Sequence, residues 1–183
     1  MASGANLPEP ADTARYRKTV ADMSVTFRRA LPWWLFAAVV TGLDQITKLL
    51  ANGQLELHRA KPVMPFFNLT LMYNEGAAFS FLSDADGWQR WFFIVLSSAV
   101  SVALVVWLTR LKPHEKWLAV GLSLVLGGAL GNLIDRVAYG HVIDFIQVYY
   151  QNWYFPTFNV ADSAISVGAT ILIATSLFGQ KAD

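Results

Sequence analysis

The stretch GGALGNLIDRVAYGHVIDFIQVYYQNWYFPTFNVADS, residues 127–163, connects two long runs of uncharged, mostly apolar residues. At or near the predicted membrane depth it carries three carboxylates, one guanidinium and two side-chain amides: Asp135, Asp144, Asp162, Arg136, Asn132 and Asn159. A charged side chain is costly next to lipid, so charged residues at this depth indicate a functional site by default. The stretch therefore predicts a membrane protein with a polar site between two of its spans.

The composition of the 183-residue chain is that of one membrane domain. Hydrophobic residues make up 55% of it and charged residues only 15%, and the mean hydropathy is positive. The net charge of +1 does not suggest a nucleic-acid partner. The chain has no cysteine, which excludes disulfides, cysteine–metal sites and thiol nucleophiles. Its three histidines are widely spaced, which argues against a zinc peptidase. We expect no metal and no cofactor.

Four apolar segments are long enough to cross a bilayer, at about 33–51, 91–109, 117–135 and 158–178. We expect a single membrane domain over residues 31–180, with a polar N-terminal extension over residues 1–30. The first half of the extension should be disordered, and residues 14–29 could form a short surface helix.

Lysine and arginine near the ends of the spans predict the topology, because they are enriched on the cytoplasmic side. The N-terminal extension carries five of them, the 110–116 loop three and the C-terminal tail one. With four spans these segments share one side, so both termini should be cytoplasmic. The 52–90 loop and the 136–157 loop should then face outward.

The first outer loop has the alternation of a β-strand. Phe67, Leu69, Leu71 and Tyr73 alternate with Asn68, Thr70 and Met72, which is the period of a half-buried strand. Asn74-Glu75-Gly76 then predicts a turn, and residues 77–82 a second strand.

The polar residues of three spans should converge on one layer near the outer surface. Asp44 and Lys48 are four residues apart, so they share one face of the first span and can pair. Asn132 and Asp135 lie near the outer end of the third span, and Asn159 and Asp162 near that of the fourth. Gly127 and Gly131, also four apart, form a small-xxx-small face for close helix packing.

Simpler explanations exist for each of these residues. Asp144 could be an exposed loop aspartate or a helix cap, and Asp162 a helix N-terminal charge favoured by the macrodipole. Asp135 and Arg136 could form a structural ion pair. Asp44 and Lys48 could be a neutralised pair that lets the helix insert, or could also brace a polar site.

Two facing carboxylates at a dry boundary would not both ionise, so they would share a proton. One could take a proton from water while the other polarises a carbonyl oxygen, which is peptide hydrolysis without a covalent nucleophile or a metal. The same pair could equally be the proton relay of a small proton-coupled transporter. A third alternative is a non-catalytic assembly protein. The spacing alone does not decide between them.

Five blocks of sequence, in order over residues 31–178, resemble the bacterial lipoprotein signal peptidase (signal peptidase II) family: LDQITK (43–48), YNEGAAFSFL (73–82), GGALGNLIDR (127–136), GHVIDFI (140–146) and FNVADSAI (158–165). The resemblance implies an aspartic endopeptidase whose catalytic dyad is Asp144 and Asp162. It implies further positions that line or brace the site: Asn74, Gly76, Asn132, Asp135, Arg136 and Asn159. Asp44 and Lys48 match the family's structural polar pair. The polar extension over residues 1–30 matches nothing in the family's working core.

The resemblance also implies the fold and the substrate. The fold is an all-α polytopic membrane protein with four transmembrane helices. A small periplasmic β-cradle should lie at about 54–82, and a periplasmic helix or flap at 145–155. The substrate is a diacylglyceryl-modified prolipoprotein, cut just before the lipidated lipobox cysteine. We expect a monomer in the bacterial inner membrane with its active site near the periplasmic surface. The runner-up is the proton-coupled transporter, which would move a solute and need no peptide.

Overall fold

The computed structural model describes residues 11–76 and 88–178, and four helices in these ranges are long and apolar enough to cross a membrane. They are α1 (Ala11–Gln54), α2 (Trp88–Thr109), α3 (Lys116–Ala138) and α4 (Val160–Phe178). The predicted four-helix membrane fold is therefore confirmed. The second, third and fourth helices begin and end within three residues of the predicted spans.

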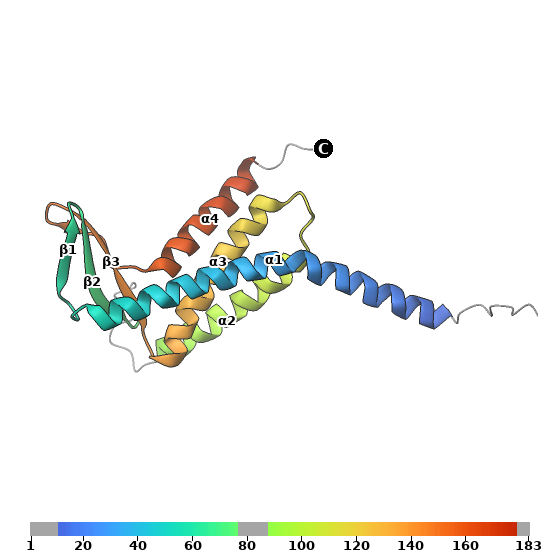
Figure 1. Ribbon diagram of the computed structural model, residues 1–183, viewed down its shortest axis with the longest axis horizontal. Coiled ribbons are helices and arrows are strands. Elements are labelled where there is room, and N and C mark those ends of the chain that lie inside the picture. The colour runs from blue at the N-terminus through green and yellow to red at the C-terminus, as the bar shows by residue number, and fades with distance from the viewer. Residues whose placement is uncertain (1–10, 77–87, 179–183) are drawn as a thin grey trace, which may run out of the picture.

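The first helix is longer than the sequence pattern predicted. Residues 11–54 form one continuous helix, so the segment expected at 14–29 is joined to the first span, and α1 extends well beyond the other helices (Figure 1). No glycine or proline lies between Ala11 and Leu31 to interrupt it. Pro32 lies inside the helix and does not end it.

The third helix is the centre of the bundle, because α1, α2 and α4 all pack against it (Figure 1). Small side chains make this close approach possible. Gly127 lies against α1, where an added Cβ would come within 2.7 Å of the Ala37 carbonyl oxygen. Gly128 lies in the same way against the Ala161 carbonyl oxygen of α4, and Gly131 against the Asp44 carboxylate. The predicted packing role of Gly127 and Gly131 is confirmed.

A four-stranded antiparallel sheet lies at one end of the bundle (Figure 1). Its strands are β1 (Ala60–Met64), β2 (Phe67–Asn74), β3 (Val142–Tyr150) and β4 (Trp153–Tyr154), in that spatial order. The predicted strand at 67–73 is confirmed, and the strand proposed at 77–82 lies outside the described residues.

The family resemblance implied a helix or a flap over residues 145–155. The structure has no helix there. These residues belong to β3 and β4, and β3 pairs with β2. The run Val142-Ile143-Asp144-Phe145-Ile146 is rich in β-branched and aromatic side chains, which favour a strand. The sheet is therefore built from the two connections at about 52–90 and 136–157, and this pairing brings residue 74 beside residue 142.

Replacing Gly127 by alanine should destabilise the protein by about 1–3 kcal/mol, because the new methyl group would overlap the backbone of α1. Gly42→Ala is the matched control, since no atom lies within 4 Å of a Cβ built there. The control should be neutral, or slightly stabilising through its higher helix propensity. Thermal unfolding of both variants in the same detergent is the measurement. Equal midpoints for the two variants would contradict the packing role of Gly127.

Candidate active site

Asp144 lies on β3, where it is only 1% exposed. The register of the sheet sets it opposite Met72, two residues before Asn74 on β2. Asn74 Nδ2 donates a hydrogen bond to Asp144 Oδ2 at 3.0 Å, and Asn159 Nδ2 donates one to Asp144 Oδ1 at 2.7 Å. Each carboxylate oxygen therefore accepts one amide N–H. Asp144 is not the exposed loop residue that its sequence position allowed.

Asp162 lies in the first turn of α4, where it forms a reciprocal cap with Asn159. Asn159 Oδ1 accepts the Asp162 N–H at 2.8 Å, and Asp162 Oδ2 accepts the Asn159 N–H at 3.3 Å. These two bonds form a capping box, which satisfies two backbone donors at the start of the helix. Asp162 Oδ1 also accepts a bond from Asn132 Nδ2 at 2.8 Å. Unlike Asp144, Asp162 is only half-buried.

Asn159, which is fully buried, connects the two aspartates. Its Nδ2 group bonds the Asp144 carboxylate, and its Oδ1 atom accepts the backbone N–H of Asp162. The same Nδ2 group lies 3.2 Å from Asn132 Oδ1, and Asn132 in turn bonds the Asp162 carboxylate. Two asparagines from α3 and from the entry to α4 thus fix the positions of both carboxylates.

A buried ion cluster adjoins this amide bridge. Lys48 Nζ lies 2.8 Å from Asp44 Oδ2, 2.8 Å from Asp135 Oδ2 and 2.8 Å from Asn132 Oδ1. Lys48 is 1% exposed, and both aspartates are fully buried. The pairing expected between Asp44 and Lys48 is therefore present, and it extends to α3. Through Asn132 it also reaches the site.

Each carboxylate of this cluster holds the chain one residue before a candidate catalytic aspartate. Asp44 Oδ1 accepts the Ala161 N–H at 2.8 Å, directly before Asp162. Asp135 Oδ2 accepts the Ile143 N–H at 3.0 Å, directly before Asp144. The cluster thus positions the backbone of α4 and β3 as well as pairing two buried carboxylates with a cation.

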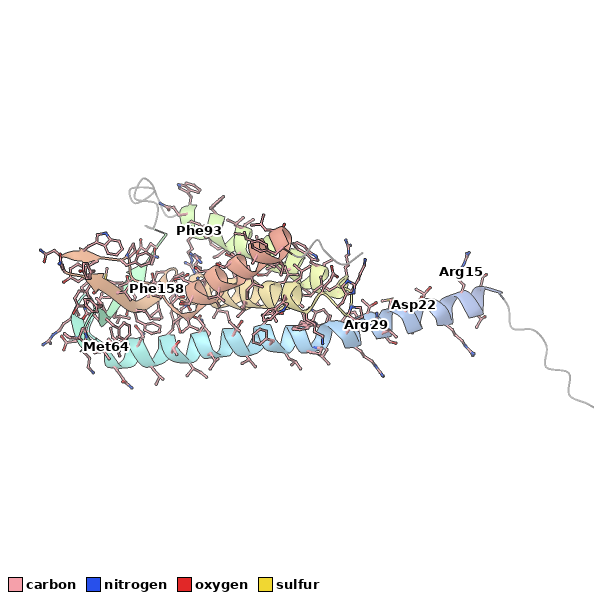
Figure 2. The ribbon with its side chains drawn as sticks, turned by 90° about the horizontal axis from the view of Figure 1, so that it is seen from above. Arg15, Asp22, Arg29, Met64, Phe93 and Phe158 are labelled. Atoms are coloured by element: carbon pink, nitrogen blue, oxygen red, sulfur yellow. The ribbon has the colours of Figure 1, made fainter. Side chains whose placement is uncertain are left out.

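The ion pair expected between Asp135 and Arg136 is wrong. Neighbouring residues on a helix point in different directions, and Asp135 turns to Lys48 instead. Arg136 lies over the Phe93 ring at 4.9 Å, and its Nη1 group donates to the Asn132 carbonyl oxygen at 3.3 Å. Within the described ranges Arg136 makes no ion pair. The Arg136 guanidinium is therefore free to bind a ligand beside the Phe93 ring. Phe93 is labelled in Figure 2.

Gly76 supports the site through Asn74. Its N–H donates to Asn74 Oδ1 at 2.9 Å, which orients the Asn74 amide nitrogen toward Asp144. Its φ of 110° belongs to the left-handed region that favours glycine. A Cβ at this position would also come within 2.8 Å of the Phe93 ring.

Two supporting residues were not found from the sequence. Gln45 Nε2 donates to Asp135 Oδ1 at 2.8 Å and to the Gly131 carbonyl oxygen at 3.1 Å. Arg90, on α2, donates to the Arg136 and Val137 carbonyl oxygens at the end of α3. Gln45 adjoins Asp44, so a polar residue beside an intramembrane charge was the available signal. Nothing in the sequence pattern points to Arg90.

The environment of Asp144 shifts its titration. Burial raises the pKa of Asp144 to about 7, and the nearby negative charge of Asp162 acts in the same direction. The hydrogen bonds from Asn74 and Asn159 and the charge of Lys48 oppose this increase in pKa. Near neutral pH Asp144 therefore exists in both its acid and its ionised forms. Within the described ranges no three His, Asp or Glu side chains are arranged to hold a metal ion.

The fold and the site define a class: a multi-pass membrane protein with two coupled, amide-bound aspartates at one end of its helices. Residues 36–178 match the family described as signal peptidase (SPase) II. The chain is 55% identical over 153 residues to the lipoprotein signal peptidase of Pseudomonas paraeruginosa and 56% identical to that of Pseudomonas fluorescens strain Pf0-1. These matches cover 82% of this chain and 90% and 89% of the two relatives. The chain belongs to the signal peptidase II family.

Solved structures agree with this assignment. Two of them, each described as a bacterial membrane enzyme, match with a TM-score of 0.72 at 33% sequence identity. The matches cover 80% and 83% of this chain and 93% of each solved chain. The chain is thus a multi-pass inner-membrane protein of a peptidase family. The comparisons do not support the alternative of a proton-coupled transporter.

Lys48→Met should destabilise the protein on the order of 3–5 kcal/mol, because it leaves two buried carboxylates without their cation. Arg59→Met is the matched control. Arg59 pairs with Glu56 at the same 2.8 Å, but their side chains are 73% and 72% exposed, so its loss should cost less than about 1 kcal/mol. Thermal or denaturant unfolding of both variants is the measurement. A loss for Lys48→Met no greater than the control's would contradict the central role of the cluster.

Asp144→Asn should remove part of the pH dependence of stability. The raised pKa means that the fold favours the neutral acid. Its contribution is therefore complete below about pH 4 and is lost as the pH rises through about 7, on the order of 4 kcal/mol in all. Unfolding midpoints of wild type and variant should be compared from about pH 4 to about pH 9. The wild type should lose stability relative to the variant over this window, and parallel curves would contradict the shift.

Proposed function

We propose that this chain is a membrane-embedded aspartic endopeptidase with Asp144 and Asp162 as its catalytic dyad. It removes the signal peptide from diacylglyceryl-modified prolipoproteins and cuts just before the lipidated cysteine. One observation carries the assignment of the dyad: a single buried amide, that of Asn159, bonds the Asp144 carboxylate and the Asp162 backbone together. Membership of the signal peptidase II family supports the substrate class.

The two aspartates differ in a way that suits acid–base catalysis. Asp162 is half-buried and reaches water, whereas Asp144 is buried and has a raised pKa. Asp162 therefore acts as the general base, and Asp144, in its protonated form, acts as the general acid. Asp162 removes a proton from a water molecule as the water oxygen attacks the scissile carbonyl carbon. Asp144 donates its proton to the carbonyl oxygen.

The tetrahedral intermediate then collapses to products. Asp162, which now holds the proton from water, gives it to the leaving amine nitrogen as the carbon–nitrogen bond breaks. Asp144 recovers its proton from the hydroxyl oxygen of the intermediate, so both residues return to their starting forms. No metal and no covalent intermediate enters this sequence of steps.

The remaining site residues have supporting roles in this proposal. Asn74 and Asn159 orient the Asp144 carboxyl group, and Asn132 orients Asp162. Arg136 makes no ion pair within the described ranges and can bind a backbone carbonyl of the substrate. One chain supplies every one of these groups, so we propose that a monomer is active.

The proposed orientation sets the site near the periplasmic surface, with both termini in the cytoplasm. The lysine and arginine bias at the other end of the bundle supports it. In this orientation the lipid chains of the substrate stay in the outer leaflet, and the signal-peptide helix lies among the spans. The sheet then lies on the periplasmic side, beside the scissile bond.

Asp144→Asn and Asp162→Asn should each lower the cleavage rate by about 10²–10⁴-fold, since each removes one proton-transfer group. The measurement is cleavage of a diacylglyceryl-modified prolipoprotein by purified protein in detergent, with product masses determined by mass spectrometry. Wild type should cut directly before the lipidated cysteine.

Asp22→Asn is the control for this experiment, because it removes the same charge from an exposed position on α1. It should leave the rate unchanged, and the unfolding midpoints should show that both dyad variants are folded. Full activity in either folded dyad variant would overturn the dyad, while the peptidase assignment would stand on the wild-type products.

A further inference from the structure

A cavity of about 180 Å³ lies at the end of the bundle opposite the candidate active site. It is bounded by α1, by the loop that follows α2, and by the start of α3. Three cations from these separate elements line it: Arg29, Lys112 and Lys116. Figure 2 labels Arg29 near the point where α1 leaves the other helices.

The cavity has an apolar floor and a cationic rim. Leu108 and Ala119, which are 2% and 1% exposed, belong to the buried core of the bundle and line the cavity. Trp33 and Leu111 pack against that core and also line it. The three cations, in contrast, are exposed. A molecule bound here would meet hydrocarbon on one side and positive charge on the other.

The described residues of the chain do not pair with these cations. Within the described part of the chain none of the three forms an ion pair. Glu115 also lines the cavity, but its Oε2 atom accepts the backbone N–H of Lys112 at 2.6 Å. Three cations against one carboxylate leave the cavity with an excess of two positive charges.

We propose that this cavity binds the phosphate of an anionic phospholipid from the adjoining leaflet. The cavity lies where α2 ends at Thr109 and α3 begins at Lys116, which is the level of the lipid headgroups. Basic pockets between transmembrane helices are suited to anionic headgroups. The apolar floor would contact the glycerol and the first carbons of the acyl chains.

A topology signal alone does not account for this arrangement. Lysines and arginines that only set the orientation need to lie near the membrane, and they need not converge. Arg110, in the same loop, is such a residue, because it is exposed and does not line the cavity. Arg29 and Lys116 are far apart in sequence, and they line the same cavity because α1 packs beside α3.

The test is native mass spectrometry of the purified full-length chain titrated with phosphatidylglycerol, with phosphatidylcholine as the neutral comparison. Wild type should retain one phosphatidylglycerol molecule more tightly than further adducts. Arg29→Gln, Lys112→Gln and Lys116→Gln should each weaken this binding about fivefold. Arg110→Gln removes the same charge from the same region and should leave the binding within about twofold of wild type.

Three results would overturn the proposal. Equal weakening by Arg110→Gln would mean general attraction to the surface, and equal retention of phosphatidylcholine would mean a site without charge selectivity. Displacement of the lipid by millimolar inorganic phosphate would mean a site for free phosphate. All four variants should retain peptidase activity in detergent, because the cavity is remote from Asp144 and Asp162. The outcome is therefore independent of the proposed catalytic function.

Discussion

The ammonium group of Lys48, buried among two carboxylates, is the constraint on which the site depends. Removing a cation and two anions from water is expensive, and only good geometry with every oxygen bonded offsets that cost. Here Asp44 Oδ1 accepts the Ala161 N–H. Asp135 Oδ2 accepts the Ile143 N–H as well as facing Lys48. The remaining oxygen of Asp135, Oδ1, accepts a hydrogen bond from Gln45 Nε2. The same bonds that satisfy the buried charges therefore fix the two segments that carry the candidate catalytic aspartates. The residues that pair the buried charges are thus the same residues that hold the candidate site in place.

The difference between the two aspartates follows from where their elements lie. Asp162 lies in the first turn of a helix, where its carboxylate accepts the Asn159 backbone N–H and remains half-exposed. Asp144 lies near the start of β3, in the buried part of the strand, and its almost complete burial favours its neutral form. Two identical side chains thus differ in solvation, because one lies in the first turn of a helix and the other in a buried strand, and this difference is what the proposed acid and base roles require.

The sequence predicted the spans, the β2 strand and the layer of polar residues, because hydropathy and residue spacing are local properties. It did not predict the partner of Asp135, since Lys48 is more than eighty residues away and adjacency favoured Arg136. Asp144 could be singled out only by family resemblance, because its burial depends on β3 pairing with β2 across the whole of α2 and α3. The continuous α1 was missed because the polar residues before Pro32 resemble a separate segment, although nothing among them breaks a helix.

The packing of the helices and the geometry of the candidate site depend on the same contacts in this fold. Lys48 can reach Asp135 only if α1 approaches α3 closely, and glycines on α3 allow that approach. Thr41 Oγ1 donates to the Gly127 carbonyl oxygen at 2.9 Å, and Gln45 Nε2 donates to the Gly131 carbonyl oxygen. Side chains of α1 therefore lie close enough to α3 to bond its backbone directly. A side chain at Gly131 would overlap the Asp44 carboxylate, which holds the start of α4. A methyl group in this interface would therefore displace the candidate site, so small residues here fix the geometry of the site as well as the packing of the helices.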